Sequence, residues 1–137
     1  MIVVKLIGGL GNQLFQYAAG TALANYHKTE LFLDLSYLNA DAKGAYTKRK
    51  FELDKFNIHA KIADESILSN FNFAENSTSV KLKKILPGMF SKVIFNEHQF
   101  NFHSNFLKFP ATTYLNGYWQ SERYFNSFRG KLLNEIT

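Results

Sequence analysis

The chain has 137 residues, enough for one domain with a buried core, and its 46% hydrophobic content excludes an intrinsically disordered chain. A formal net charge of +5 suits an anionic partner such as a nucleotide-sugar phosphate and does not single out nucleic acid, so no nucleic-acid partner is expected. The absence of cysteine excludes disulfides and thiolate chemistry, and no apolar run reaches the roughly 18 residues that a membrane span requires.

The first third of the chain predicts a strand, a turn, a helix and a second strand. Residues 2–7 (IVVKLI) are apolar except for Lys5 and rich in β-branched side chains, which is typical of a strand buried on both faces. Helical periodicity follows over 12–27, where several alanines allow close packing on a sheet. Residues 30–35 (ELFLDL) predict the second strand, so the whole segment reads as a βαβ unit.

The remainder predicts shorter elements. They are a loop at 39–50, a short helix capped by Asp64, a polar linker at 72–79, a helix at 80–86, strands at 92–95 and 113–119, and a helix from Ser121 almost to the end of the chain. This alternation predicts an α/β fold with a Rossmann-like open parallel sheet and flanking helices. Ligands bind such sheets at the carboxyl ends of the strands, so we expect residues 8–13, 34–37 and 117–120 along one rim.

The glycine-rich turn at 8–13 (GGLGNQ) is the most informative local feature. Without Cβ atoms the backbone turns sharply, and the amides that open the next helix stabilise an anion such as a pyrophosphate. A dinucleotide fingerprint would begin at Gly9, place Gly11 second and use Asp34 on a ribose, but Leu14 stands where its third glycine belongs. A tight turn without any ligand is the other interpretation that turn chemistry allows.

Two longer blocks carry a resemblance to a known family. Residues 8–20 (GGLGNQLFQYAAG) resemble the N-terminal signature of the α-1,2-fucosyltransferases of glycosyltransferase family eleven. Residues 114–125 (YLNGYWQSERYF) resemble the aromatic-rich segment that precedes the domain crossover of that family. Residues 95–100 resemble the family more weakly. The resemblance therefore covers the whole chain, strongly at its two ends and loosely between them.

The resemblance implies a two-domain GT-B enzyme with a cleft between Rossmann-like domains. Residues 1–137 would be the N-terminal, acceptor-side domain. Such enzymes transfer fucose from GDP-fucose to the 2-hydroxyl of a galactoside with inversion, and they need neither a metal nor a cofactor besides the donor. The expected partners are a nucleotide sugar, a glycan acceptor and the C-terminal domain of the same enzyme, in a bacterial polysaccharide pathway.

The donor-side motif of that family, His-x-Arg-x-Gly-Asp-Tyr, does not occur in this sequence. We therefore expect the C-terminal donor-binding domain to be absent from this chain and the isolated chain to be inactive. Two other functions stay open: a nucleotide-binding Rossmann oxidoreductase, and a non-catalytic carbohydrate-binding or assembly module. A cytoplasmic location is expected, and Lys81, Lys83 and Lys84 leave peripheral contact with the inner membrane face open.

Several residues are candidates for binding the donor or acceptor: Gly9, Gly11, Asn12, Gln13 and Trp119. The amide of Asn12 would bind a phosphate or sugar hydroxyl, or else cap the helix. The rings of Tyr118 and Trp119 would stack on a sugar, or else lie in the core. The four histidines lack metal-ligand spacing, so no metal site is expected.

An inverting transfer needs a group that accepts the proton of the attacking hydroxyl. The candidates are Asp34, Glu97, His98 and Glu122. Each has a simpler interpretation: Asp34 would cap a turn, Glu97 and His98 would form a surface pair, and Glu122 would favour a helix dipole. Spacing alone does not choose among them, and an enzyme without a protein base is also open.

Overall fold

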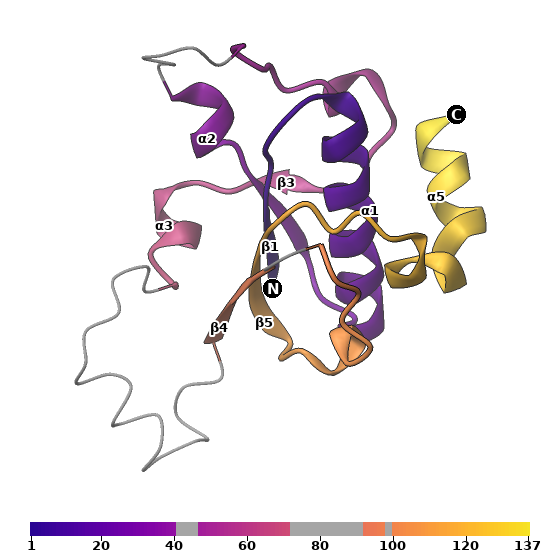
Figure 1. The fold of residues 1–137 in the computed structure, drawn as a ribbon. Helices are drawn as coiled ribbons and strands as arrows, with labels where there is room; N and C mark the ends of the chain where they lie inside the picture. The colour runs from indigo at the N-terminus through magenta and orange to yellow at the C-terminus, as the bar shows by residue number, and fades with distance from the viewer. Residues whose placement is uncertain (41–46, 72–91, 98–99) are drawn as a thin grey trace.

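The computed structural model describes residues 1–40, 47–71, 92–97 and 100–137 (Figure 1). Its helices and strands are β1 (Ile2–Lys5), α1 (Leu10–His27), β2 (Leu31–Asp34), α2 (Ser36–Asn39), β3 (Lys61–Ile62), α3 (Glu65–Leu68), β4 (Lys92–Asn96), β5 (Thr112–Asn116) and α5 (Arg129–Ile136). The predicted strands at 2–7, 30–35, 92–95 and 113–119 and the predicted helix at 12–27 are all present, with boundaries shifted by up to three residues. The predicted helix at 80–86 lies outside the described residues.

The strands form one sheet in the order β3-β2-β1-β5-β4, and every pairing is parallel. β1 lies at the centre, with β2 on one side and β5 on the other. The prediction of an α/β fold with a Rossmann-like open parallel sheet is confirmed. The edge strand β3 was not predicted, because its two residues, Lys61 and Ile62, are exposed and show no alternation of polar and apolar side chains.

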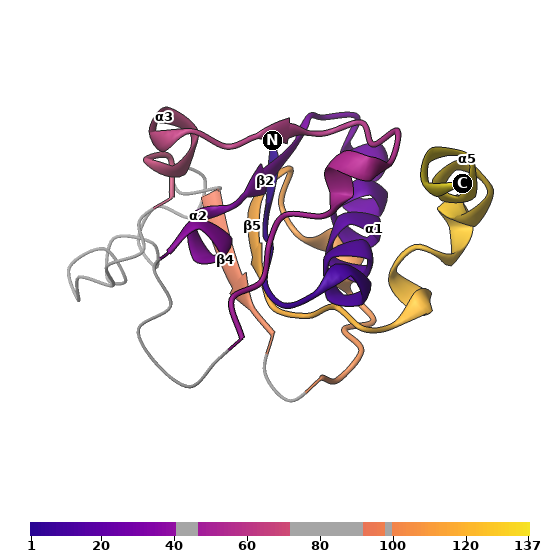
Figure 2. The same cartoon turned by 90° about the horizontal axis from the view of Figure 1, so that it is seen from above.

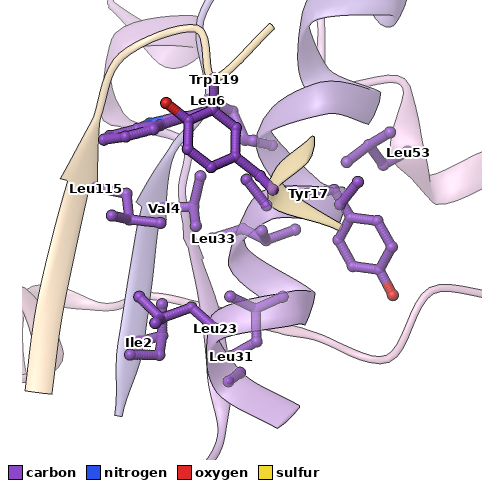
Figure 3. Close-up of a cluster of buried hydrophobic side chains, with 14 of the residues drawn as sticks. Ile2, Val4, Leu6, Tyr17, Leu23, Leu31, Leu33, Leu53, Leu115 and Trp119 are labelled. Atoms are coloured by element: carbon purple, nitrogen blue, oxygen red, sulfur yellow. The ribbon is translucent and has the colours of Figure 1, made fainter. Parts of the chain in front are cut away.

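Helices cover both faces of the sheet (Figure 2). Because successive side chains of a strand point to opposite faces, β1 and β2 each supply two layers. Val4 and Leu33 belong to the larger core on the α1 side (Figure 3), whereas Val3 and Phe32 belong to a second cluster with Phe71, which follows α3. This burial on both faces explains the nearly continuous apolar runs in the sequence.

Asp64 caps α3 as the sequence predicts, since its Oδ1 accepts a hydrogen bond from the Ile67 amide at 2.9 Å. The short helix α2 was not predicted, because the turn that produces it depends on Asp34, whose Oδ1 accepts from the Ser36 amide at 2.9 Å. In the part of the chain that the structure describes, no helix combines the length and apolar character needed to cross a membrane. Lys81, Lys83 and Lys84 lie outside that part, so membrane contact stays a prediction.

The prediction of one helix from Ser121 onward is wrong in its first half. Two 3-10 turns, Glu122–Tyr124 and Asn126–Phe128, precede α5. The φ angle of −131° at Phe125 interrupts the helical path between them. Tyr124 is buried in the main core while Phe125 packs against Phe15 of α1, with 5.9 Å between ring centroids. The backbone break at Phe125 therefore sets the directions of the two neighbouring rings, in place of a continuous helical path.

α5 lies against the outer side of α1, away from the sheet (Figure 1). Leu132 is buried in the main core, and the Glu135 carboxylate accepts a hydrogen bond from the Tyr17 hydroxyl at 2.5 Å. Burial and this bond to Glu135 raise the pKa of Tyr17 to about 12. A buried polar contact thus fixes α5 on α1 in addition to apolar packing.

Candidate ligand site at the carboxyl ends of the strands

Loops that the sequence predicts to form one rim do meet at one edge of the sheet. The glycine turn follows β1, residues 35–37 follow β2, and residues 117–120 follow β5. Because all the strands are parallel, their carboxyl ends share that edge. The strand order reverses at β1, which is where open α/β sheets bind ligands.

The glycine turn requires glycine at its first position. Gly8 has a φ of +79°, and a Cβ there would lie 2.3 Å from Asn12 Nδ2. Gly9 is the N-cap of α1 and supplies no side-chain hydrogen bond to the first amides of the helix. Asn12 is therefore the third residue of α1 and not its cap, which corrects the alternative role considered for it. The amino end of this 18-residue helix carries partial positive charge without a capping side chain.

An arginine distant in sequence lies beside this turn. A Cβ on Gly9 would be 3.7 Å from Arg49 Nη1, so the guanidinium lies beside Gly9. Arg49 is exposed to solvent. The guanidinium of Arg49 and the positively charged amino end of α1 therefore lie side by side. This arrangement favours a bound anion. This contact was not predictable from the sequence, because it joins residues 40 positions apart through folding alone.

Gln13 holds the segment that carries Arg49. Its side chain is fully buried, and its Nε2 donates to the carbonyl oxygens of Gly8 at 3.0 Å and Lys50 at 2.7 Å. Its Oε1 accepts from the Glu52 amide at 3.0 Å. The amide group is thus occupied by backbone atoms. Gln13, expected to contact a ligand, is instead placed to join the glycine turn to residues 50–52.

Gln16 makes the corresponding connection to the loop after β5. It is fully buried, its Oε1 accepts from the Ile7 amide at 3.1 Å, and its Nε2 donates to the carbonyl of Gly117 at 3.1 Å. The two buried glutamines lie about one helical turn apart. Gln13 connects residues 50–52 to the glycine turn, and Gln16 connects the loop after β5 to the end of the segment that leads into that turn. Such buried amides cost stability unless they are paired, and both are paired here.

The corner at 117–120 depends on Glu97. The Oε2 atom of Glu97 accepts from the amides of Tyr118 at 2.7 Å and Trp119 at 3.0 Å. A Cβ on Gly117 would lie 2.4 Å from the Cβ of Glu97, so glycine is required there for this approach. Glu97, a candidate base, has one carboxylate oxygen committed to the backbone of the corner.

Trp119 does not present its ring at the surface. It is fully buried among the core side chains (Figure 3) and has a left-handed φ of 53°. Its ring packs with those of Phe106 and Tyr124 at 5.6 Å between ring centroids. The expectation that this ring stacks on a sugar does not fit its position, because the turn directs it into the core. Its neighbour Gln120 faces solvent and donates to Asn12 Oδ1 at 2.6 Å. Asn12 is partly exposed, and Gly11 beside it is exposed.

The remaining candidate bases have different surroundings. Asp34 is 3% exposed, and its Oδ2 accepts from the Tyr114 hydroxyl at 2.5 Å. Burial and this bond to Asp34 raise the pKa of Tyr114. Glu122 is exposed at the start of the 3-10 turn that Ser121 caps. His98 lies outside the described residues. Both carboxylate oxygens of Asp34 are engaged, one by the Ser36 amide and the other by the Tyr114 hydroxyl, so its role in catalysis stays a prediction.

Comparison with known proteins gives two relatives. The chain is 32% identical over 138 aligned positions to an alpha-1,2-colitosyltransferase of Escherichia coli, covering all of this chain and 45% of that protein. It is 52% identical over 54 residues to the O-antigen biosynthesis glycosyltransferase WbnK of Escherichia coli, covering 39% of this chain and 18% of that protein. The chain thus spans less than half the length of each relative. No protein-family model and no solved structure matches it. Both relatives are glycosyltransferases, and the chain is similar to part of each.

Proposed function

We propose that the chain is the acceptor-side domain of a glycosyltransferase of bacterial O-antigen assembly, which transfers fucose from GDP-fucose to the 2-hydroxyl of a galactoside with inversion. The observation that carries the proposal is the similarity to an α-1,2-colitosyltransferase along the whole chain. The resemblance of residues 8–20 and 114–125 to α-1,2-fucosyltransferases supports the same linkage. Most of the donor site would belong to a C-terminal domain facing this rim.

In this proposal the glycine turn and Arg49 act on the diphosphate of the donor. The acceptor hydroxyl attacks the anomeric carbon, the bond from that carbon to the β-phosphate oxygen breaks, and the electron pair leaves with GDP. Negative charge grows on that oxygen, where the guanidinium of Arg49 and the open amides of α1 stabilise it. Asn12, held by Gln120, would bind a phosphate or a sugar hydroxyl.

The acceptor proton has no assigned destination in this domain. The carboxylates of Asp34 and Glu97 are engaged with Tyr114 and with the corner backbone. Either Glu122, His98, a group of the C-terminal domain or the leaving phosphate would receive the proton. No metal enters the proposed step, in which Arg49 and the helix amides carry the charge.

Colitosyl transfer is the second candidate, because the relative that matches the whole chain is a colitosyltransferase. Colitose is the 3-deoxy form of fucose, so the two candidates differ by a single hydroxyl of the donor. A site that binds this hydroxyl rejects the sugar lacking it strongly, whereas an apolar site discriminates weakly. Comparing GDP-fucose with GDP-colitose as donors for the enzyme that carries this domain separates the two candidates.

The proposal is tested by titrating the isolated chain with GDP-fucose, GDP-colitose and NAD in a calorimeter. A GDP-sugar is expected to bind with a dissociation constant of about 1 mM or lower, and NAD at least ~10-fold more weakly. Preference for NAD would overturn the proposal in favour of an oxidoreductase. A chain that binds a galactoside but neither GDP-sugar would favour the non-catalytic carbohydrate module. Transfer of fucose to lactose by the isolated chain would contradict the need for a second domain.

A further inference from the structure

An exposed pair of aromatic rings lies on the same rim, beyond the corner that contacts the glycine turn. Phe100 follows β4 and is 66% exposed, although it is one of the largest apolar side chains. Its ring lies 5.5 Å from that of Tyr118, which follows β5, at an interplanar angle of 34°. Phe100 also has a left-handed φ of 54°, an uncommon conformation for a bulky residue. Exposure and backbone strain at one aromatic residue are together typical of a functional site.

The neighbouring backbone fixes the position of Tyr118. Its amide donates to Glu97 Oε2 at 2.7 Å, and the carbonyl of the preceding Gly117 accepts from buried Gln16 at 3.1 Å. The backbone of Tyr118 is therefore held in place, while its side chain remains partly exposed. A ring on a fixed backbone loses less conformational entropy than a ring on a mobile loop when a ligand stacks on it.

The same strand ends also carry amide side chains. Asn96 and Asn116 are paired in register as the last residues of β4 and β5, and Asn116 Nδ2 donates to Asn96 Oδ1 at 2.7 Å. That bond uses one donor and one acceptor of the two amides and leaves the other atoms of each group for a ligand. Flat rings with uncharged amides nearby are the chemistry that binds a sugar, whose C–H face meets a ring while its hydroxyls meet amides.

We propose that Phe100 and Tyr118 form the stacking face of the acceptor subsite and take the apolar face of a galactoside ring. This assignment rests on the proposed function, which supplies a galactoside as the acceptor. A short segment joins this stacking face to the glycine turn, where the proposed reaction takes place. Gln120, two residues after Tyr118, donates a hydrogen bond to Asn12. The sugar would lie on the β4 side of the turn, and the diphosphate at the turn itself.

The test uses the isolated chain and methyl β-D-galactopyranoside, followed by chemical-shift changes in NMR spectra. We expect millimolar binding, with shifts in the ring signals of Phe100 and Tyr118, and at least ~5-fold weaker binding in F100A and Y118A. Y118F should bind within about twofold of the unchanged chain, because stacking uses the ring and not the hydroxyl. Y26A is the matched control, since Tyr26 is 54% exposed at the far end of α1.

This inference would be overturned if F100A and Y118A both bound the galactoside as tightly as the chain without substitutions. It would also be overturned if the galactoside caused no chemical-shift change in the ring signals of the chain without substitutions. The near-UV circular dichroism of Trp119, the single tryptophan of the sequence, reports whether each variant keeps the corner folded. F100L, which keeps an apolar side chain without a ring, repeats the test if F100A is unfolded. GDP-fucose binding distinguishes the two failures: galactoside stacking in a chain that does not bind GDP-fucose counts against the proposed function and leaves the stacking face in place, whereas GDP-fucose binding without galactoside stacking counts against this inference alone.

Discussion

Gly20 and Gly11 lie in the same helix with opposite surroundings. A Cβ on Gly20 would lie 2.4 Å from Val4 Cγ2 and 2.9 Å from Leu31 Cδ1. Gly20→Ala should lower the free energy of unfolding by about 1–3 kcal/mol, because overpacking against the sheet outweighs the gain in helix propensity. Urea unfolding followed by far-UV circular dichroism measures the change.

Gly11→Ala is the matched control in the first turn of α1. Beyond its chain neighbours and the backbone of its own helix, no atom lies within 4 Å of a Cβ built there, so only the propensity gain applies, and stability should rise by up to ~1 kcal/mol. A Gly20→Ala chain as stable as Gly11→Ala would show that the helix can move away from the sheet without cost.

The buried hydroxyl of Tyr17 predicts a loss of stability in alkaline solution. Its pKa is raised from 10.0 to about 12 in the folded chain, so the folded state holds this proton more tightly than the unfolded state. The stabilisation is complete below pH 10 and is lost as the pH rises from 10 toward 12. The loss attributable to Tyr17 should approach roughly 2–3 kcal/mol, at 1.36 kcal/mol for each pKa unit.

Y17F removes this titration and serves as the comparison. Its absolute stability will be lower, because Glu135 loses a hydrogen-bond donor, so the informative quantity is the slope of unfolding free energy against pH. Between pH 9 and 11.5 the unchanged chain should show the steeper fall. Equal slopes in the two chains would mean that Tyr17 does not titrate anomalously.

At the scale of elements, the loop after β5 depends on one carboxylate. E97A removes the acceptor for the amides of Tyr118 and Trp119 and should cost about 1–3 kcal/mol, with a changed near-UV signal from Trp119. E97Q keeps an oxygen that can accept both bonds and should retain most of the stability and that signal. In the proposed glycosyltransferase, E97Q should likewise retain activity. If Glu97 were the catalytic base, E97Q would be as inactive as E97A with the Trp119 signal unchanged.

Regular elements were predictable from the sequence where burial imposes a pattern. β1, α1 and β2 carry apolar runs or helical periodicity because each is packed on the core. The edge strand β3 has no such burial, and the segment from Ser121 onward has helical periodicity that the separate packing of Tyr124 and Phe125 overrides. Local pattern thus identifies the layers of the sheet and fails where tertiary contacts decide the backbone.

The candidate site was predictable only in part, for the same reason. The glycine at position 8 can be seen in the sequence, and it indicates the positive φ that the backbone adopts there. The position of Arg49 beside Gly9, and the burial of Gln16 and Trp119, arise from contacts between distant segments, which no local pattern encodes. Sequence therefore located the rim, and the structure divided its residues into those that build it and those that face solvent.

At the scale of the whole molecule, charge and topology act on the same edge of the sheet. The net charge of +5 attracts any anion toward the chain from any direction, and salt screens this attraction over about 10 Å at 0.1 M ionic strength. The open amino end of α1 and Arg49 act only at short range, at the carboxyl ends of the strands. General attraction and local recognition are therefore separable by experiment.

Arg49→Gln and Lys48→Gln make this separation, because each removes one positive charge from neighbouring exposed residues. The long-range attraction falls equally in both, while only Arg49 lies beside Gly9. GDP-fucose binding, measured by calorimetry, should weaken about 10-fold in Arg49→Gln and less than about twofold in Lys48→Gln, as expected for loss of a charge-assisted hydrogen bond to phosphate. Raising the salt concentration should shrink the Lys48→Gln effect to nothing and leave most of the Arg49→Gln effect. Equal losses in both variants would show that the chain attracts the donor through its overall charge and that the glycine turn does not bind the diphosphate.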